Sequence, residues 1–88
     1  MAIAARLTDP KSGRTLEAYT TEPGIQVYTA NFCSGYPIQF GCTAPRRSAI
    51  CLESEHFPDT PNRPYFPSCV LNPGEKYNQR TIYKFGTI

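Results

Sequence analysis

One acidic residue, Glu53, carries a carboxylate at a position in the sequence where it could meet a ligand. It lies in the stretch Ala49–Asp59, AICLESEHFPD, whose alternating pattern predicts a β-strand that ends at a proline-rich loop. Successive side chains of a strand point to opposite faces, so one face carries Ala49, Cys51 and Glu53 and the other carries Ile50, Leu52 and Ser54. Ile50 and Leu52 anchor the second face, which leaves the first face for a carboxylate that meets a ligand. The alternative is an ordinary solvated glutamate on a half-buried strand, since glutamate is rarely buried.

The overall composition excludes several classes of partner. The chain has 88 residues, with nine Lys and Arg against seven Asp and Glu, and its basic residues are scattered apart from Arg46-Arg47. This pattern predicts no nucleic-acid-binding stripe and no membrane-binding patch. No apolar run approaches the roughly 18–20 residues that span a bilayer, and the first residues, MAIAARLTD, do not resemble a signal peptide. We therefore expect a cytoplasmic protein.

The four cysteines do not predict a metal site or a cofactor. Cys33, Cys42, Cys51 and Cys69 show no C-x₂-C spacing, and the one histidine, His56, lies in no ligand cluster. Four cysteines allow three different disulfide pairings. Reduced thiols that pack as small hydrophobic side chains are the favoured interpretation.

The elements that must position Glu53 are all predicted to be strands. Alternating or β-branched runs predict strands at 2–7, 15–20, 25–31, 48–54 and 77–85, and no stretch shows the 3.6-residue period of a capped helix. On the last strand, Thr81, Tyr83 and Phe85 share a face. The fold class is therefore all-β, with antiparallel strands and long loops.

Turn and loop sequences separate these strands. The segment from Asp9-Pro10 to Gly13 predicts a hairpin loop, Glu22-Pro23-Gly24 suits a type II turn, and residues 72–75 predict another turn. Residues 33–47 predict a long irregular loop. Residues 58–67 form a loop with a proline at every third position, which permits an alternative function: a non-catalytic β-module that binds a partner through a polyproline II segment.

The apolar residues are few for a closed two-sheet sandwich, and a chain of this length buries a modest fraction of its surface. We expect residues 1–88 to be one portion of a single larger β-domain, without an internal boundary. Its exposed strand edges would pair with the missing part of the fold or with a second copy.

Three motifs in order resemble the aldose 1-epimerase (galactose mutarotase) family. Residues 20–31 match TTEPG-x-Q-x-YT-x-N, residues 51–67 match CLE-x-x-x-(F/Y)PD-x-x-N-x-P-x-(F/Y)P, and residues 73–77 match PGE-x-Y. The resemblance covers nearly the whole chain except residues 33–45. Because the family's enzymes are much longer, the chain resembles the C-terminal portion of a galactose mutarotase-like β-sandwich.

The resemblance implies a reaction and two site residues. Family enzymes interconvert the α and β anomers of free aldoses such as galactose and glucose through ring opening, and need no cofactor. Their general base is the glutamate of the CLE motif, which is Glu53 here, and the glutamine of PG-x-Q-x-YT that lines the sugar site is Gln26. The catalytic acid is a histidine earlier in the fold, and His56 does not occupy its position. The resemblance thus predicts that the isolated chain is inactive. Glu55 stands where many relatives have glutamine, and we expect its side chain to turn to solvent.

Overall fold

A computed structural model describes residues 1–32, 35–37, 41 and 43–88. These residues form strands, turns and one short 3-10 helix, η2 (Thr60–Asn62). The strands are β1 (Ala2–Thr8), β2 (Arg14–Thr20), β3 (Gly24–Tyr28), β4 (Tyr36–Pro37), β5 (Thr43–Ala44), β6 (Cys51–Glu55) and β7 (Thr81–Thr87). All described strand pairs are antiparallel, which confirms the all-β prediction.

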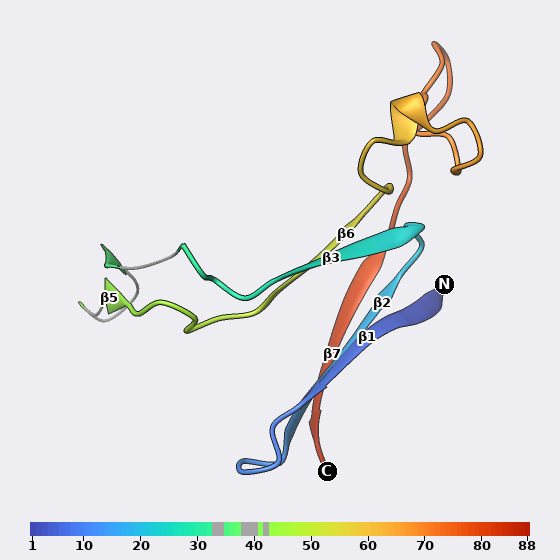
Figure 1. The fold of residues 1–88 in the computed structure, drawn as a ribbon. Coiled ribbons are helices and arrows are strands. Elements are labelled where there is room, and N and C mark those ends of the chain that lie inside the picture. The colour runs from blue at the N-terminus through green and yellow to red at the C-terminus, as the bar shows by residue number, and fades with distance from the viewer. Residues whose placement is uncertain (33–34, 38–40, 42) are drawn as a thin grey trace.

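The largest sheet joins the two ends of the chain, in the strand order β1-β2-β7 (Figure 1). The β1–β2 hairpin is closed as predicted: Gly13 N–H donates to the Asp9 carbonyl at 2.8 Å, and Gly13 has a φ of 75°. On β7, Tyr83 lies opposite Ala18 and Phe85 lies opposite Leu16. This register agrees with the prediction that alternate residues of β7 share one face.

The second sheet is the two-stranded ladder β3–β6, which runs from Gly24 opposite Glu55 to Tyr28 opposite Cys51. Both strands are shorter than predicted. β3 ends at Tyr28 and not at residue 31, because Ala30 has a φ of 58°; Arg47, before β6, has a φ of 62°. Arg47 N–H donates to the Ala30 carbonyl at 3.0 Å, so these two left-handed residues leave the ladder together. β6 consequently starts at Cys51 and not at residue 48.

Within the predicted loop 33–47, the structure shows a small hairpin, with Tyr36 opposite Ala44 and Pro37 opposite Thr43. It lies at the end of an arm that extends away from the three-stranded sheet (Figure 1). Two-residue strands leave too short a pattern for an alternation to be seen, so the sequence does not reveal them.

Polar contacts join the two larger sheets. Ser54 Oγ of β6 lies 2.7 Å from Thr81 Oγ1 of β7, and Tyr83 Oη donates to the Leu52 carbonyl at 2.6 Å. β7 is therefore attached to both sheets, by a backbone ladder to β2 and by side chains to β6. Its ladder begins at Thr81, so the predicted strand start at residue 77 is wrong.

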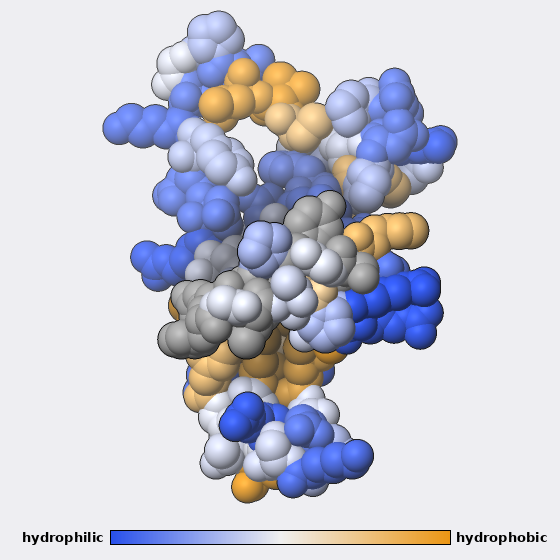
Figure 2. Space-filling view, turned by 90° about the vertical axis from the view of Figure 1, so that its left-hand side faces the viewer, coloured by the Kyte–Doolittle hydropathy of each residue, from blue (hydrophilic) through white to orange (hydrophobic). Residues whose placement is uncertain are grey.

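The buried apolar core is small. Among the described residues, Ala18, Ala30 and Leu52 are the buried hydrophobic ones. The radius of gyration is 16.6 Å, against about 12 Å for a compact domain of this length. The accessible surface is 7107 Å², against about 5,200 Å² for a folded monomer of this size. Figure 2 shows hydrophobic side chains at the surface, in a band in the lower half of the view and in a second group near the top. These observations confirm that the apolar residues do not close a sandwich by themselves.

Of two turns predicted around a glycine, the structure confirms one and contradicts the other. Gly74 has a φ of 86°, and Glu75 N–H donates to the Asn72 carbonyl at 3.1 Å, so the predicted turn at 72–75 is confirmed. The predicted type II turn at residues 22–24 is wrong, because it needs a left-handed Gly24. Gly24 is instead the first residue of β3 and lies outside that region.

Cys51 and Cys69 are free thiols. Cys51 is half-buried, as the packing interpretation requires, whereas Cys69 is exposed and does not fit it. Cys33 and Cys42 lie outside the described residues. Across the described part of the chain, no helix has the length and apolar character needed to cross a membrane.

Candidate active site

The β3–β6 ladder places the two predicted site residues directly opposite each other. Gln26 of β3 pairs with Glu53 of β6 in the middle of the ladder. Directly opposite residues of an antiparallel pair point to the same face, with Cβ atoms about 4.5–5.5 Å apart. A carboxylate and an amide thus share one surface, although 27 positions separate them in the chain.

Both side chains are exposed. Gln26 Nε2 donates to the Val27 carbonyl at 3.3 Å, a weak local bond that leaves the amide oxygen available. Within the described residues, no hydrogen bond or ion pair holds the Glu53 carboxylate. The pair therefore offers a proton acceptor next to a group that can both donate and accept hydrogen bonds.

An apolar groove of about 460 Å³ runs beside Glu53. It lies between the two larger sheets, and its lining residues are Leu16, Ile50, Cys51, Leu52, Glu53, Tyr83 and Phe85. Sequence reasoning did not assign Leu16, Tyr83 or Phe85 to the site. Their signal was present in the alternation of β2 and β7, but only the pairing of those strands shows that they meet near Glu53.

Two expectations about the neighbours of Glu53 need correction. Leu52 is 6% exposed and anchors its face as predicted, but Ile50 is 51% exposed because it precedes β6 and lies on the open groove. Glu55 is half-buried and does not turn fully to solvent. Glu55 pairs with Gly24 at the end of the ladder, and the Phe57 ring lies beside Gly24.

His56 does not point into the groove that Glu53 lines. Its Nδ1 lies 3.2 Å from Oε2 of Glu22, in the turn between β2 and β3. His56 borders a separate hollow of about 400 Å³, which shares no lining residue with the groove at Glu53. His56 therefore does not line the groove beside Glu53.

The proline-rich loop does not form one polyproline II helix. Asp59 has a φ of 64°, and the 3-10 helix η2 follows it immediately. Phe66 of this loop packs against Phe57, with ring centroids 5.1 Å apart. The loop is thus folded onto the end of β6, and an extended ligand for an aromatic-lined partner is not preformed.

Comparisons with known proteins agree with the motifs around this ladder. The profile of the family Aldose 1-epimerase matches residues 1–84. The chain belongs to the aldose 1-epimerase family. It is 48% identical over 84 residues to galactose mutarotase of Mus musculus and 46% identical over 84 residues to that of Homo sapiens. It is 38% identical over 85 residues to aldose 1-epimerase of Escherichia coli (strain K12).

Each of these aldose 1-epimerase family matches covers 94% of this chain and 25% of the relative. The chain therefore spans about a quarter of the length of the curated relatives it matches. The family match includes β2, β3, β6 and residues 81–84 of β7, so all residues that line the groove beside Glu53 lie inside it except Phe85.

Proposed function

We propose that this chain supplies the general base of an aldose 1-epimerase and acts on free aldoses such as galactose and glucose. The observation that carries the proposal is the pairing of Glu53 with Gln26 on one exposed face, beside the apolar groove. The names of the relatives give the reaction: mutarotation, the interconversion of α and β anomers.

The proposed step begins with the proton on the anomeric oxygen, O1. The Glu53 carboxylate takes this proton while the C1–O5 bond breaks, the C1=O1 carbonyl forms and O5 receives a proton from an acid. Rotation about C1–C2 and the reverse step on the other face then give the second anomer. A positioned base of this kind contributes about 10²–10⁴-fold to the rate. Gln26 can hold a sugar hydroxyl with its amide while Glu53 acts.

The acid is proposed to come from outside these 88 residues. The one histidine, His56, is engaged with Glu22 and lines a hollow that excludes Glu53. Ring opening needs a second group that donates a proton to O5 while Glu53 takes the proton from O1, so the chain alone is proposed to be inactive.

The same proposal concerns the domain. Residues 1–88 would be one portion of a larger β-sandwich, in which the matching remainder of the fold covers the apolar groove. The large accessible surface and the small buried core support this assembly. We also expect a cytoplasmic setting, where unpaired thiols such as Cys51 and Cys69 stay reduced.

The test compares the 88-residue chain with a graft, in which this chain replaces the matching quarter of the Mus musculus galactose mutarotase. Polarimetry follows freshly dissolved α-D-galactose and α-D-glucose, and circular dichroism checks that each protein is folded. We expect the graft to accelerate mutarotation and the chain alone to match buffer. A folded but inactive graft contradicts the proposed function. Activity of the chain alone, if Glu53→Gln abolishes it, contradicts the need for an external acid.

A further inference from the structure

The carboxylate of Glu22 is enclosed at one end of the β3–β6 ladder, and both of its oxygens have partners. Its side chain is 5% exposed. Oε1 accepts a hydrogen bond from Tyr77 Oη at 2.7 Å, and Oε2 lies 3.2 Å from Nδ1 of His56. A buried carboxylate is costly unless it is paired and hydrogen-bonded, so these two contacts are conditions for Glu22 to occupy this place.

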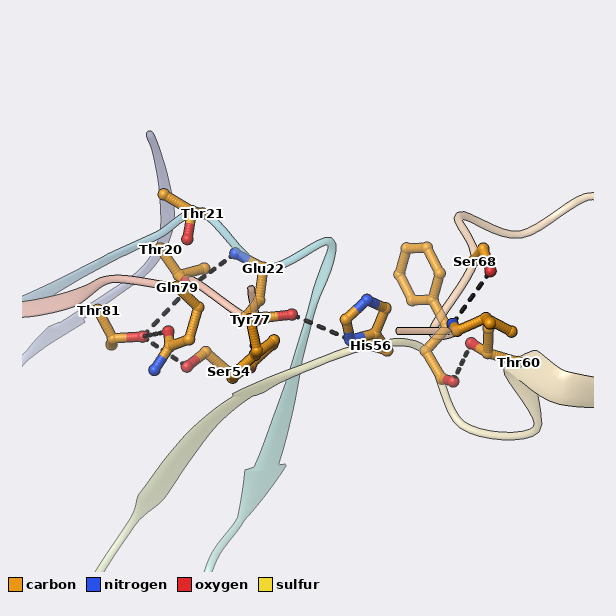
Figure 3. Close-up of polar contacts among 12 residues, drawn as sticks. Thr20, Thr21, Glu22, Ser54, His56, Thr60, Ser68, Tyr77, Gln79 and Thr81 are labelled. Carbon is orange, nitrogen blue, oxygen red and sulfur yellow. Dashed lines mark hydrogen bonds and ion pairs between the residues drawn. The ribbon is translucent and has the colours of Figure 1, made fainter. Parts of the chain in front are cut away.

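The three residues belong to three segments that meet at one end of the ladder (Figure 3). Glu22 lies two residues before Gly24, the first residue of β3, and His56 follows Glu55, the last residue of β6. Gly24 and Glu55 form the terminal pair of the ladder, and Gln26 and Glu53 are only two pairs further along. The Glu22–His56 contact thus closes the ladder next to the site residues.

A second set of polar contacts fixes the position of Glu22 itself. Its N–H donates to Thr20 Oγ1 at 3.0 Å, Thr20 Oγ1 lies 3.2 Å from Thr81 Oγ1, and Thr81 Oγ1 lies 2.7 Å from Ser54 Oγ. This chain of hydroxyls, visible in Figure 3, returns to β6 one residue from Glu53. The end of β6 is therefore held to the turn after β2 from two sides.

The register of β6 decides where Glu53 points. A shift by one residue transfers every side chain of a strand to the opposite face. Glu53 would then leave the face of Gln26, and Leu52, which is 6% exposed, would be turned out of its buried place. A ladder of five pairs has few backbone bonds to resist such a shift, so a contact at its end has a large influence.

We propose that Glu22, held by His56 and Tyr77, is a positioning residue that keeps Glu53 in register opposite Gln26. The proposal rests on the proposed function, because it assigns the effect on rate to Glu53. It also gives the one histidine of the chain a role that its loop position in the sequence did not suggest. In this role, His56 neither touches substrate nor transfers a proton.

The test is a double-mutant cycle in the graft. His56→Phe keeps a flat ring but removes the nitrogen that faces Glu22, whereas His56→Asn keeps a donor near the same place. We expect His56→Phe to lower kcat about tenfold, because misplacement of a reacting group by a fraction of an ångström to 1 Å costs up to about 10²-fold. His56→Asn should restore most of the loss. Arg63→Gln, which breaks the exposed ion pair with Asp59, is the matched control and should change kcat less than about twofold.

The same substitutions in a Glu53→Gln background separate positioning from simple loss of folded protein. If His56 acts through Glu53, His56→Phe should change the residual kcat less than about twofold there, because effects of residues that act together are not additive. An equal loss in both backgrounds, or no rescue by Asn, overturns the proposal. If Glu53→Gln itself leaves the rate unchanged, the proposed function fails instead.

Amide hydrogen exchange of the same proteins provides a readout that does not depend on turnover. His56→Phe should speed exchange at residues 24–26 and 53–55, at the end of the ladder next to Glu22, more than at β1 and β2. Unchanged exchange at this end of the ladder would show that the contact does not hold the register, and would overturn the proposal.

Discussion

Gly24 provides the sharpest test of how closely the ladder is packed beside Glu53. A Cβ atom added at this position would lie 2.8 Å from Cδ1 and 3.0 Å from Cε1 of Phe57, and 3.4 Å from the Glu55 carbonyl oxygen. The Phe57 ring cannot simply move aside, because it is half-buried and packs against Phe66 with ring centroids 5.1 Å apart. Gly24→Ala must therefore displace either this ring or the start of β3.

The expected cost combines two opposing terms. Overpacking of this kind costs about 1–3 kcal/mol, whereas replacing glycine by alanine within a strand gains about 0.5–1 kcal/mol. Gly24 has a φ outside the left-handed region, so the second term applies here. The net result is a loss of about 1 kcal/mol in the free energy of unfolding. Without the Phe57 ring, only the gain from replacing glycine by alanine should remain.

Urea denaturation of the graft, followed by circular dichroism, measures both cases. Gly24→Ala should lower the free energy of unfolding by about 1 kcal/mol in the unmodified background and raise it by about 0.5–1 kcal/mol in a Phe57→Ala background. The coupling between the two sites is then about 2 kcal/mol, within the range found for residues in contact. The same effect of Gly24→Ala in both backgrounds would show that Phe57 does not pack over the ladder.

Three further predictions use the same unfolding assay. Leu52→Ala should lower the free energy of unfolding by about 2–3 kcal/mol. This value is toward the low end for a buried leucine, because one side of Leu52 borders the open groove. A loss below about 1 kcal/mol would show that Leu52 is not a core residue. The hydrogen bond that Tyr77 donates to Glu22 raises the pKa of Tyr77. This hydrogen bond contributes fully to the free energy of unfolding below the unfolded pKa of about 10, and its contribution is lost as the pH rises through the folded pKa. Tyr77→Phe should therefore remove part of the alkaline loss of stability, and an unchanged alkaline profile would contradict the contact. Hydrogen bonds from Ser12 and Lys11 lower the pKa of Asp9, so its contribution is complete above the unfolded pKa of about 4 and is lost as the pH falls through the folded value; Asp9→Asn should flatten that part of the acid profile.

The strands that carry the site were predictable from the sequence because each has a long enough alternation. The pattern of residues 25–31 identified β3, and that of residues 48–54 identified β6 with Glu53 and Leu52 on opposite faces. The pairing of Gln26 with Glu53 was not predictable from alternation, because a period of two fixes faces but not the register between strands.

Strand ends and the role of His56 depend on contacts that sequence patterns do not contain. Ala30 and Arg47 are not glycines, yet both adopt left-handed conformations, and no local sequence pattern predicts these conformations. The Glu22–His56 contact joins residues 34 positions apart, and neither residue stands in a pattern that points to the other. The resemblance of the motifs to aldose 1-epimerases, and not the alternation, identified Glu53 and Gln26 as site residues.

Two neighbouring glutamates of β6, compared in the graft, test directly whether Glu53 is the general base. Glu53 and Glu55 lie on the same face of the strand, so Glu53→Gln and Glu55→Gln make the same chemical change two positions apart. The kcat for α-D-galactose mutarotation, measured by polarimetry, should fall by about 10²-fold or more in Glu53→Gln, as expected for loss of a general base. Glu55→Gln should keep kcat within about threefold. Full activity of Glu53→Gln, or an equal loss in Glu55→Gln, would contradict the assignment of Glu53 as the base.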